Sequence, residues 1–221
     1  MIYFLDEHPT KCASYYAVDH LKSTTREAIQ VLSDATRLII EECRIHSLEK
    51  KMVDVRHDVK DERYWAGLER DCPLPMKDPD DPLVLWCVED QDAWDWMMEF
   101  ISDLLMETRN WFDKGPDQAD VDGACWLRVN APRPVNAGRI LRRRLLFPLS
   151  AKVPKEFISS DLFASDVPQR TKLELTVRAY RLMYWTRFKS SMRYTSSRRP
   201  WWWGSLGCVH GTPLASNDPE K

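Results

Sequence analysis

The strongest structural signal in the chain is the stretch LKSTTREAIQVLSDATRLII at residues 21–40. Five of its apolar residues recur at helical spacing: Leu21, Ala28, Leu32, Ala35 and Ile39. Neither Pro nor Gly interrupts this pattern, and either would weaken a helix. The stretch therefore predicts the core of one amphipathic helix, which begins at about Thr10 or Ser14 and ends at Ile45.

Two further long helices follow along the chain. Asp90 is a suitable N-cap for the first of them, which ends at the Gly115-Pro116 pair. Its apolar residues form one stripe: Trp94, Met97, Met98, Ile101, Leu104, Leu105, Trp111 and Phe112. The second helix occupies about residues 169–194 and has an apolar inner face: Leu175, Ala179, Leu182, Met183 and Trp185.

The segments between these helices are polar or rich in proline. Residues 52–81 are predicted to form a loop or a lid, and residues 129–154 a loop with a short helix. We therefore expect an all-α fold, a single compact domain of three long helices with long irregular connections. This domain is expected to span residues 1–205, and residues 206–221 are expected to form a C-terminal tail.

The composition is that of a folded protein, with 43% hydrophobic and 30% charged residues among 221. It excludes a disordered chain and a disulfide-stapled miniprotein. The six cysteines form no Cys-x-x-Cys pair and no ligand-like spacing with the five histidines, so neither a metal site nor a cofactor is predicted. No signal peptide and no apolar run of roughly 20 residues is present, which predicts a cytoplasmic protein without a membrane partner. We also expect the protein to be a monomer.

The charge is distributed unevenly, although the formal net charge is only −2. Residues 126–200 contain 17 Lys or Arg and 4 Asp or Glu, a balance of +13, which leaves −15 for the rest. A basic segment of this size predicts phosphate binding, and the alternative is that the two parts of the chain neutralise each other. Within it, Arg142, Arg143 and Arg144 are predicted to contact phosphate or else to form a solvated turn.

The chain contains 10 Trp, and three of them, Trp201, Trp202 and Trp203, directly follow Arg198 and Arg199. Three adjacent indoles cannot all face one core, so at least one should be exposed or inserted into a partner. We predict that they stack on bases or wedge into an opened duplex beside the two arginines. The alternative is a segment that wraps over the first helix and closes the core. Other Trp residues at helical spacing are predicted to be core: Trp94, Trp96, Trp111 and Trp185.

The predicted first helix also carries a set of polar residues that suits acid/base chemistry. His20 and Glu27 are seven residues apart, almost two turns, so both emerge on one face. Arg26 is adjacent to Glu27 and can shift its pKa or hold a phosphate near it. The face is extended by three polar residues: Ser23, Gln30 and Asp34. These residues could support reaction at a bound nucleotide, or they could form the solvated face of an amphipathic helix.

The sequence around these residues resembles a known family. Asp19-His20-Leu21 followed by Arg26-Glu27 resembles the first-helix motif of the phage pyrimidine-dimer DNA glycosylases of the endonuclease V type. Residues 82–86 with the helix at 90–108 resemble that family's second helix and its lead-in, and residues 199–204 resemble its aromatic C-terminal segment.

A wider set of phage proteins is more closely similar. Its members share a Leu-Asp-x-x-Pro turn, a Cys-Ala pair, a His-(x)6-Glu-x-x-Gln helix and an Ala-Tyr-Arg helix before a Trp-rich tail. The corresponding elements here are Leu5 to Pro9, Cys12-Ala13, His20 to Gln30, and Ala179-Tyr180-Arg181.

The resemblance implies an enzyme that acts on a pyrimidine nucleotide in double-stranded DNA, in the cytoplasm of an infected bacterial host cell. It implies that a terminal amine attacks the sugar C1′ and that Glu27 stabilises the resulting intermediate, while His20 and Arg26 contact the DNA. Because bulky Ile2 disfavours removal of the initiator residue, the amine would be that of Met1. The substrate pocket is expected to include Ser23, Gln30, Tyr180 and Tyr184, and the DNA groove Arg181 and Lys189.

Two alternatives remain open. The first is an amino acid:DNA transferase that hypermodifies activated 5-hydroxymethyluracil, in which Glu27 or His20 deprotonates the amine of a free amino acid. Arg181 or Lys189 would then hold the leaving pyrophosphate. The second is a non-catalytic DNA-binding or anti-defence protein in which the acidic part of the chain contacts a partner.

Overall fold

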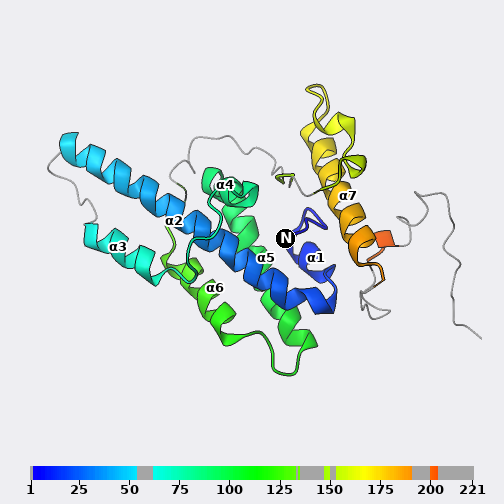
Figure 1. Ribbon diagram of the computed structural model, residues 1–221, viewed down its shortest axis with the longest axis horizontal. Coiled ribbons are helices and arrows are strands. Elements are labelled where there is room, and N and C mark those ends of the chain that lie inside the picture. The colour runs from blue at the N-terminus through cyan, green and yellow to red at the C-terminus, as the bar shows by residue number, and fades with distance from the viewer. Residues whose placement is uncertain are drawn as a thin grey trace, which may run out of the picture.

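The stretch that begins at Leu21 forms helix α2, Leu21–Val53, and most of the other elements pack around it (Figure 1). The computed structural model describes residues 2–53, 62–132, 134, 147–149, 153–190 and 200–203. The other α-helices are α1 Pro9–Ser14, α3 Glu62–Asp71, α4 Pro82–Glu89, α5 Gln91–Trp111, α6 Gln118–Asn130 and α7 Gln169–Phe188. Three short 3₁₀ turns occupy Val18–His20, Lys155–Phe157 and Ser160–Leu162. Since these residues contain no β-strand, the prediction of an all-α domain is confirmed, with α2, α5 and α7 as its three long helices.

The first predicted helix is interrupted, contrary to the expectation of one continuous helix from Thr10 or Ser14. Helix α1 ends at Ser14, and Ala17 is extended, with φ −63° and ψ 147°. The Ala17 N–H donates to the hydroxyl of Tyr184 at 2.9 Å, the bond that a continuous helix would have made to a carbonyl. The break is therefore stabilised by a residue on α7.

The expectation that residues 52–81 form only a loop or a lid is also wrong in part, because α3 occupies part of this segment. The Arg44 side chain of α2 contacts the carboxylates of Glu62 and Glu69 on α3. Residues 72–81 do form a loop, and the buried Asp34 carboxylate accepts the backbone N–H groups of Lys77 and Asp78 at 3.1 Å each. Two charged side chains of α2 therefore hold this segment in place: Arg44 contacts α3, and Asp34 binds the loop at residues 72–81.

The helices after this loop begin where side-chain caps are available. Asp81 caps α4 and Asp90 caps α5, each by accepting the N–H two residues later at 2.8 Å. Helix α5 crosses α2 and ends at Trp111, slightly before the predicted end at Gly115 (Figure 1). Helix α6 has no counterpart among the predicted helices.

Helix α7 lies beside the N-terminal segment, residues 2–6, and packs against the two 3₁₀ turns that precede it in the chain (Figure 1). The Tyr3 ring contacts Tyr184 and Phe188 of α7, with centroids 5.0 and 5.9 Å away. This segment has no strand partner, so side chains satisfy its backbone: the Tyr16 hydroxyl accepts the Tyr3 N–H at 2.6 Å and donates to the Tyr3 carbonyl at 2.8 Å. Arg181 donates to the Leu5 carbonyl at 2.7 Å.

Most of the tryptophans belong to the core, as predicted for the helical ones. Trp94, Trp96 and Trp185 are buried, and Trp111 is partly buried against the same core. Helix α7 ends at Phe188, earlier than predicted, and residues 191–199 lie outside the described residues, as does the predicted tail. Among the helices of the described ranges, none is long and apolar enough to cross a membrane.

Candidate functional site

Glu27 occupies the centre of the candidate site, because its half-buried side chain lines two neighbouring hollows. The smaller one, of about 130 Å³, is called the His20 hollow and has these walls: Tyr3, Tyr16, His20, Ser23, Thr24, Glu27, Tyr184, Arg187 and Phe188. The larger one, of about 250 Å³, is called the acidic hollow, and its walls include Ile2, Glu27, Asp34, Asp78 and Asp81. Ile2 lines the acidic hollow and Tyr3 lines the His20 hollow, so these two residues lie on either side of the Glu27 carboxylate.

The imidazole of His20 is held by Tyr184, a residue of α7. Its Nδ1 lies 2.9 Å from the Tyr184 hydroxyl, which already accepts the Ala17 N–H. If the hydroxyl donates its proton to Nδ1, both groups are satisfied, and a neutral His20 carries its own proton on Nε2. Burial lowers the pKa of His20 below 6.5; Asp19 opposes this shift and Arg187 reinforces it. A neutral imidazole is therefore favoured at pH 7.

Arg187 belongs to this hollow although the sequence did not single it out. It lies in the last turn of α7, is exposed, and donates a long hydrogen bond of 3.5 Å to the Tyr3 hydroxyl. Burial raises the pKa of Tyr3, and the positive charge of Arg187 opposes that shift. No local motif marks Arg187, because it approaches Glu27 only when α7 packs against the N-terminal segment.

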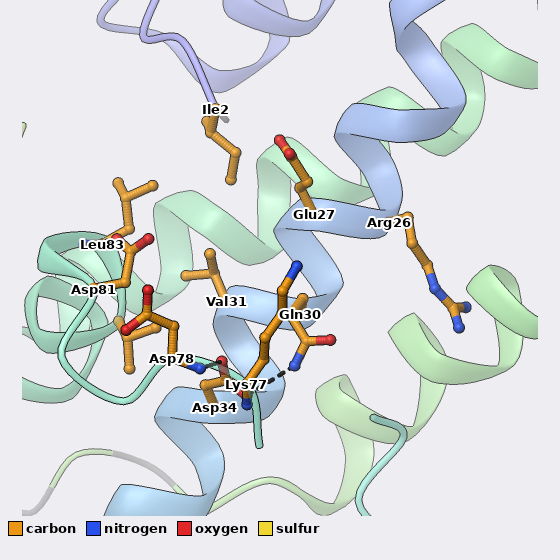
Figure 2. Close-up of a pocket in the computed structure, with 11 residues that line it drawn as sticks. Ile2, Arg26, Glu27, Gln30, Val31, Asp34, Lys77, Asp78, Asp81 and Leu83 are labelled. Carbon is orange, nitrogen blue, oxygen red and sulfur yellow. Dashed lines mark hydrogen bonds between the residues drawn. The ribbon is translucent and has the colours of Figure 1, made fainter. Parts of the chain in front are cut away.

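The acidic hollow has an apolar wall and a charged wall. Figure 2 shows Ile2, Glu27 and Leu83 around the same space, with Asp78 and Asp81 across from α2. The predicted pocket residue Gln30 lines this hollow, and its side-chain amide donates to Asp34 and to the Pro75 carbonyl at 2.8 Å each. A ligand here would meet more carboxylates than cations.

Arg26 is adjacent to Glu27 in sequence and also lines the acidic hollow, but its guanidinium extends towards α6 (Figure 2). Its guanidinium forms an ion pair of 2.7 Å with Asp120, whose side chain is almost completely buried. The predicted role of Arg26, holding a phosphate beside Glu27, therefore competes with a structural ion pair. Ser23 fits its prediction better: it lines the His20 hollow and its hydroxyl donates to the His20 carbonyl at 3.1 Å.

The two tyrosines predicted for the pocket are separated by the structure. Tyr184 lines the His20 hollow, whereas fully buried Tyr180 donates to the Pro148 carbonyl at 2.8 Å and packs against Phe4. Lys189 lies with its ammonium 4.5 Å from the centre of the Trp185 ring. Tyr180 thus has a core role in addition to any role in substrate binding.

Arg181 and Trp201 line a third region, the Trp201 hollow of about 280 Å³, together with Asp6 and Tyr15. The Arg181 guanidinium pairs with Asp6 at 3.0 Å and lies over the rings of Trp201 and Trp202, so its predicted phosphate contact would require it to leave these partners. Trp202 and Trp203 are buried, whereas Trp201 is 73% exposed. Each of the two interpretations of the triplet therefore fits part of it: Trp202 and Trp203 close the core, and Trp201 faces outward.

Several predicted site residues lie outside the described residues: Met1, Arg142, Arg143, Arg144, Arg198 and Arg199. Within the described ranges, no group of three or more His, Cys, Asp or Glu side chains is placed to hold a metal ion. The predicted phosphate contacts of these five arginines therefore stay predictions.

Comparison with protein-family models, with curated proteins and with solved structures finds no match for this chain. The chemistry of the site is accordingly judged from its own groups. A half-buried carboxylate, a neutral imidazole and an exposed guanidinium share one hollow. Together they can move a proton next to a bound anion, such as a nucleotide phosphate.

Proposed function

We propose that this protein is a DNA-acting enzyme of phage type that works on a pyrimidine nucleotide in double-stranded DNA, with pyrimidine-dimer glycosylase/AP-lyase-like chemistry. The observation that carries the proposal is the position of Glu27 between two hollows, against the N-terminal residues Ile2 and Tyr3. The resemblance assigns the attack to a terminal amine and the stabilisation of the intermediate to this carboxylate. In the structure, the segment that would carry the amine lies beside Glu27.

The proposed chemistry has two stages. The Met1 amine attacks C1′ as the bond from C1′ to the base breaks, and the base leaves with the electron pair. The bond from C1′ to the ring oxygen O4′ then breaks, one proton passes from the amine nitrogen to O4′, and a protonated imine remains whose positive charge Glu27 stabilises. Glu27 next removes a proton from C2′, and the bond from C3′ to the phosphate oxygen breaks. An amine with a pKa near 8 has a substantial neutral fraction at cellular pH, so it can act as the nucleophile.

Replacement of Glu27 tests this role. Glu27→Gln keeps the side-chain size but removes the charge, so strand cleavage of ultraviolet-irradiated or abasic duplex DNA should fall by roughly 10²- to 10⁴-fold. The matched control is Glu42→Gln, an exposed position about 22 Å further along α2, which should keep wild-type activity. Borohydride should trap a covalent adduct at the Met1 amine of the full chain.

The same experiment separates the proposal from a purely binding protein. If Glu27→Gln retains biological activity and DNA affinity, a non-catalytic DNA-binding or anti-defence role is supported instead. If borohydride traps no adduct on abasic DNA, the lyase chemistry is rejected.

The acidic hollow favours a second candidate, the amino acid:DNA transferase that hypermodifies activated 5-hydroxymethyluracil. Three Asp carboxylates and Glu27 line this hollow against two cations, Arg26 and Lys77, and this acidic excess suits the amine of a small co-substrate better than a DNA phosphate. Glu27 would take a proton from the amine, the amine nitrogen would bond to the 5-methylene carbon, and pyrophosphate would leave with the bonding electrons.

The two candidates differ in their products. The protein would be incubated with free amino acids and with DNA that carries pyrophosphorylated hydroxymethyluracil. The DNA would then be digested to nucleosides, and their masses would be measured by mass spectrometry. A nucleoside gaining the mass of an amino acid supports the transferase. An unchanged digest together with cleavage of abasic DNA supports the lyase.

A further inference from the structure

Arg26, which is predicted to hold a phosphate beside Glu27, already has an ion-pair partner in the structure. Arg26 also borders the acidic hollow, but its guanidinium extends away from the carboxylate of Glu27 and pairs with Asp120 (Figure 2). Releasing Arg26 to bind a phosphate would leave a buried carboxylate without its ion-pair partner, which is unfavourable. Arg181, also predicted to bind DNA, is engaged in the same way by Asp6.

Arg187 differs from these two arginines in its partners. It is exposed, it lines the His20 hollow together with Glu27, and among the described residues no carboxylate lies within ion-pairing distance of it. Its hydrogen bond to the Tyr3 hydroxyl is long, at 3.5 Å, so a stronger acceptor would compete for the guanidinium easily.

We propose that Arg187 binds the DNA phosphate next to the nucleotide on which Glu27 acts, an inference that rests on the proposed DNA-acting function. A guanidinium presents paired donors that match phosphate oxygens, and here it lies on the same hollow as the predicted carboxylate. The phosphate and its sugar are neighbours along the strand, so one hollow can hold the phosphate at Arg187 and the sugar at Glu27.

The fold supports this assignment from both sides of the hollow. Arg187 comes from α7, whereas Glu27 comes from α2, and the N-terminal segment lies between these helices. Phe188 packs against His20, with ring centroids 4.3 Å apart, and thereby fixes the end of α7 near the site. Binding of a strand would therefore span the junction between α7 and the rest of the domain.

The test is the salt dependence of DNA binding by the full-length protein. Affinity for a fluorescent abasic duplex would be measured between 50 and 200 mM salt for the wild type, Arg187→Gln and Arg187→Lys. Arg187→Gln should weaken binding on the order of tenfold and reduce the slope of log K against log salt by about 0.9, the value for one phosphate contact. Arg187→Lys should keep the slope, because the charge remains.

The matched control is Arg178→Gln, which removes the same charge from an exposed position on α7. Nine residues separate Arg178 from Arg187, which places them on opposite faces of the helix, so the control should keep the wild-type slope. Circular dichroism would show that Arg187→Gln, Arg187→Lys and Arg178→Gln all fold.

A neutral methylphosphonate placed at single positions of the strand identifies the phosphate. At the contacted position it should weaken the wild type but cause no further loss in Arg187→Gln, since both changes remove one interaction. An unchanged slope in Arg187→Gln, or equal losses for both proteins at every position, would overturn the inference. If the wild type itself shows no salt-dependent binding to the duplex, the proposed function is overturned instead.

Discussion

His20 shows how its surroundings set the state of a single side chain. Its ring is partly buried between Tyr184 and Phe188, and burial favours the neutral form. The hydroxyl of Tyr184 positions the ring through Nδ1, which leaves Nε2 for a ligand. A neutral, oriented imidazole can donate to an anionic substrate or accept a proton after a small change in pH.

The lowered pKa of His20 has a consequence for stability. The unfolded chain, with a histidine pKa near 6.5, binds this proton more readily than the folded protein does. The contribution of His20 to stability is therefore fully present above about pH 6.5 and is lost as the pH falls through the lower folded value. The free energy of unfolding of the wild type should fall more steeply below pH 6.5 than that of His20→Gln. A ring that titrates by NMR at or above 6.5 would contradict this expectation.

The N-terminal segment, residues 2–6, is the element on which the site depends most. It has an extended backbone without a sheet, so its polar groups rely on side chains from α7 and from the residues around α1. The thiol of Cys12 accepts the Leu5 N–H, and burial raises its pKa to about 12, so it stays protonated. This arrangement places Ile2 and Tyr3 next to Glu27.

Removal of one hydroxyl should loosen this segment. Tyr16→Phe deletes both hydrogen bonds to the Tyr3 backbone in a buried setting and should lower the free energy of unfolding by about 1–3 kcal/mol. Hydrogen exchange at the Tyr3 amide should also become faster. The control Tyr64→Phe, at a side chain of α3 that is 42% exposed, should change stability by less than about 0.5 kcal/mol. Equal effects in the two variants would show that the segment is held in another way.

At the scale of the whole molecule, the Trp-rich segment links α7 to the start of the helical core. Trp202 packs against Tyr15, with centroids 5.9 Å apart, and Trp203 packs against Trp185 at 6.5 Å. Trp201 remains outside, next to Arg181. The segment thus combines the two interpretations of the sequence, since it closes the core and also presents one indole at the surface.

The stability of the whole molecule should distinguish the two neighbouring indoles. Trp202→Ala should cost about 3–5 kcal/mol, because its side chain is 2% exposed and its removal leaves a cavity. Trp201→Ala should cost less than about 1 kcal/mol, the value of a surface cation–π contact with Arg181. Chemical denaturation of both variants measures the difference. Comparable losses would mean that Trp201 belongs to the core.

The sequence alone was sufficient for features that depend on neighbours along the chain. The apolar spacing in α2 and α5 and the N-cap at Asp90 were predicted correctly, because helix periodicity and capping are local. The break before α2 was missed, since the Ala17 N–H is satisfied by Tyr184, 167 residues away. Helix α6 was missed as well, because its buried face includes Asp120 and Gly123, so the helix shows no continuous apolar stripe.

The candidate site divides in the same way. The spacing of His20 and Glu27 on one face followed from helix geometry, and the structure places both on one hollow. The partners of the arginines did not follow, because Asp120 and Asp6 reach Arg26 and Arg181 only through packing of distant segments. Arg187 approaches Glu27 for the same reason. Burial and ion pairing depend on contacts between residues far apart in the chain, which a local pattern does not contain.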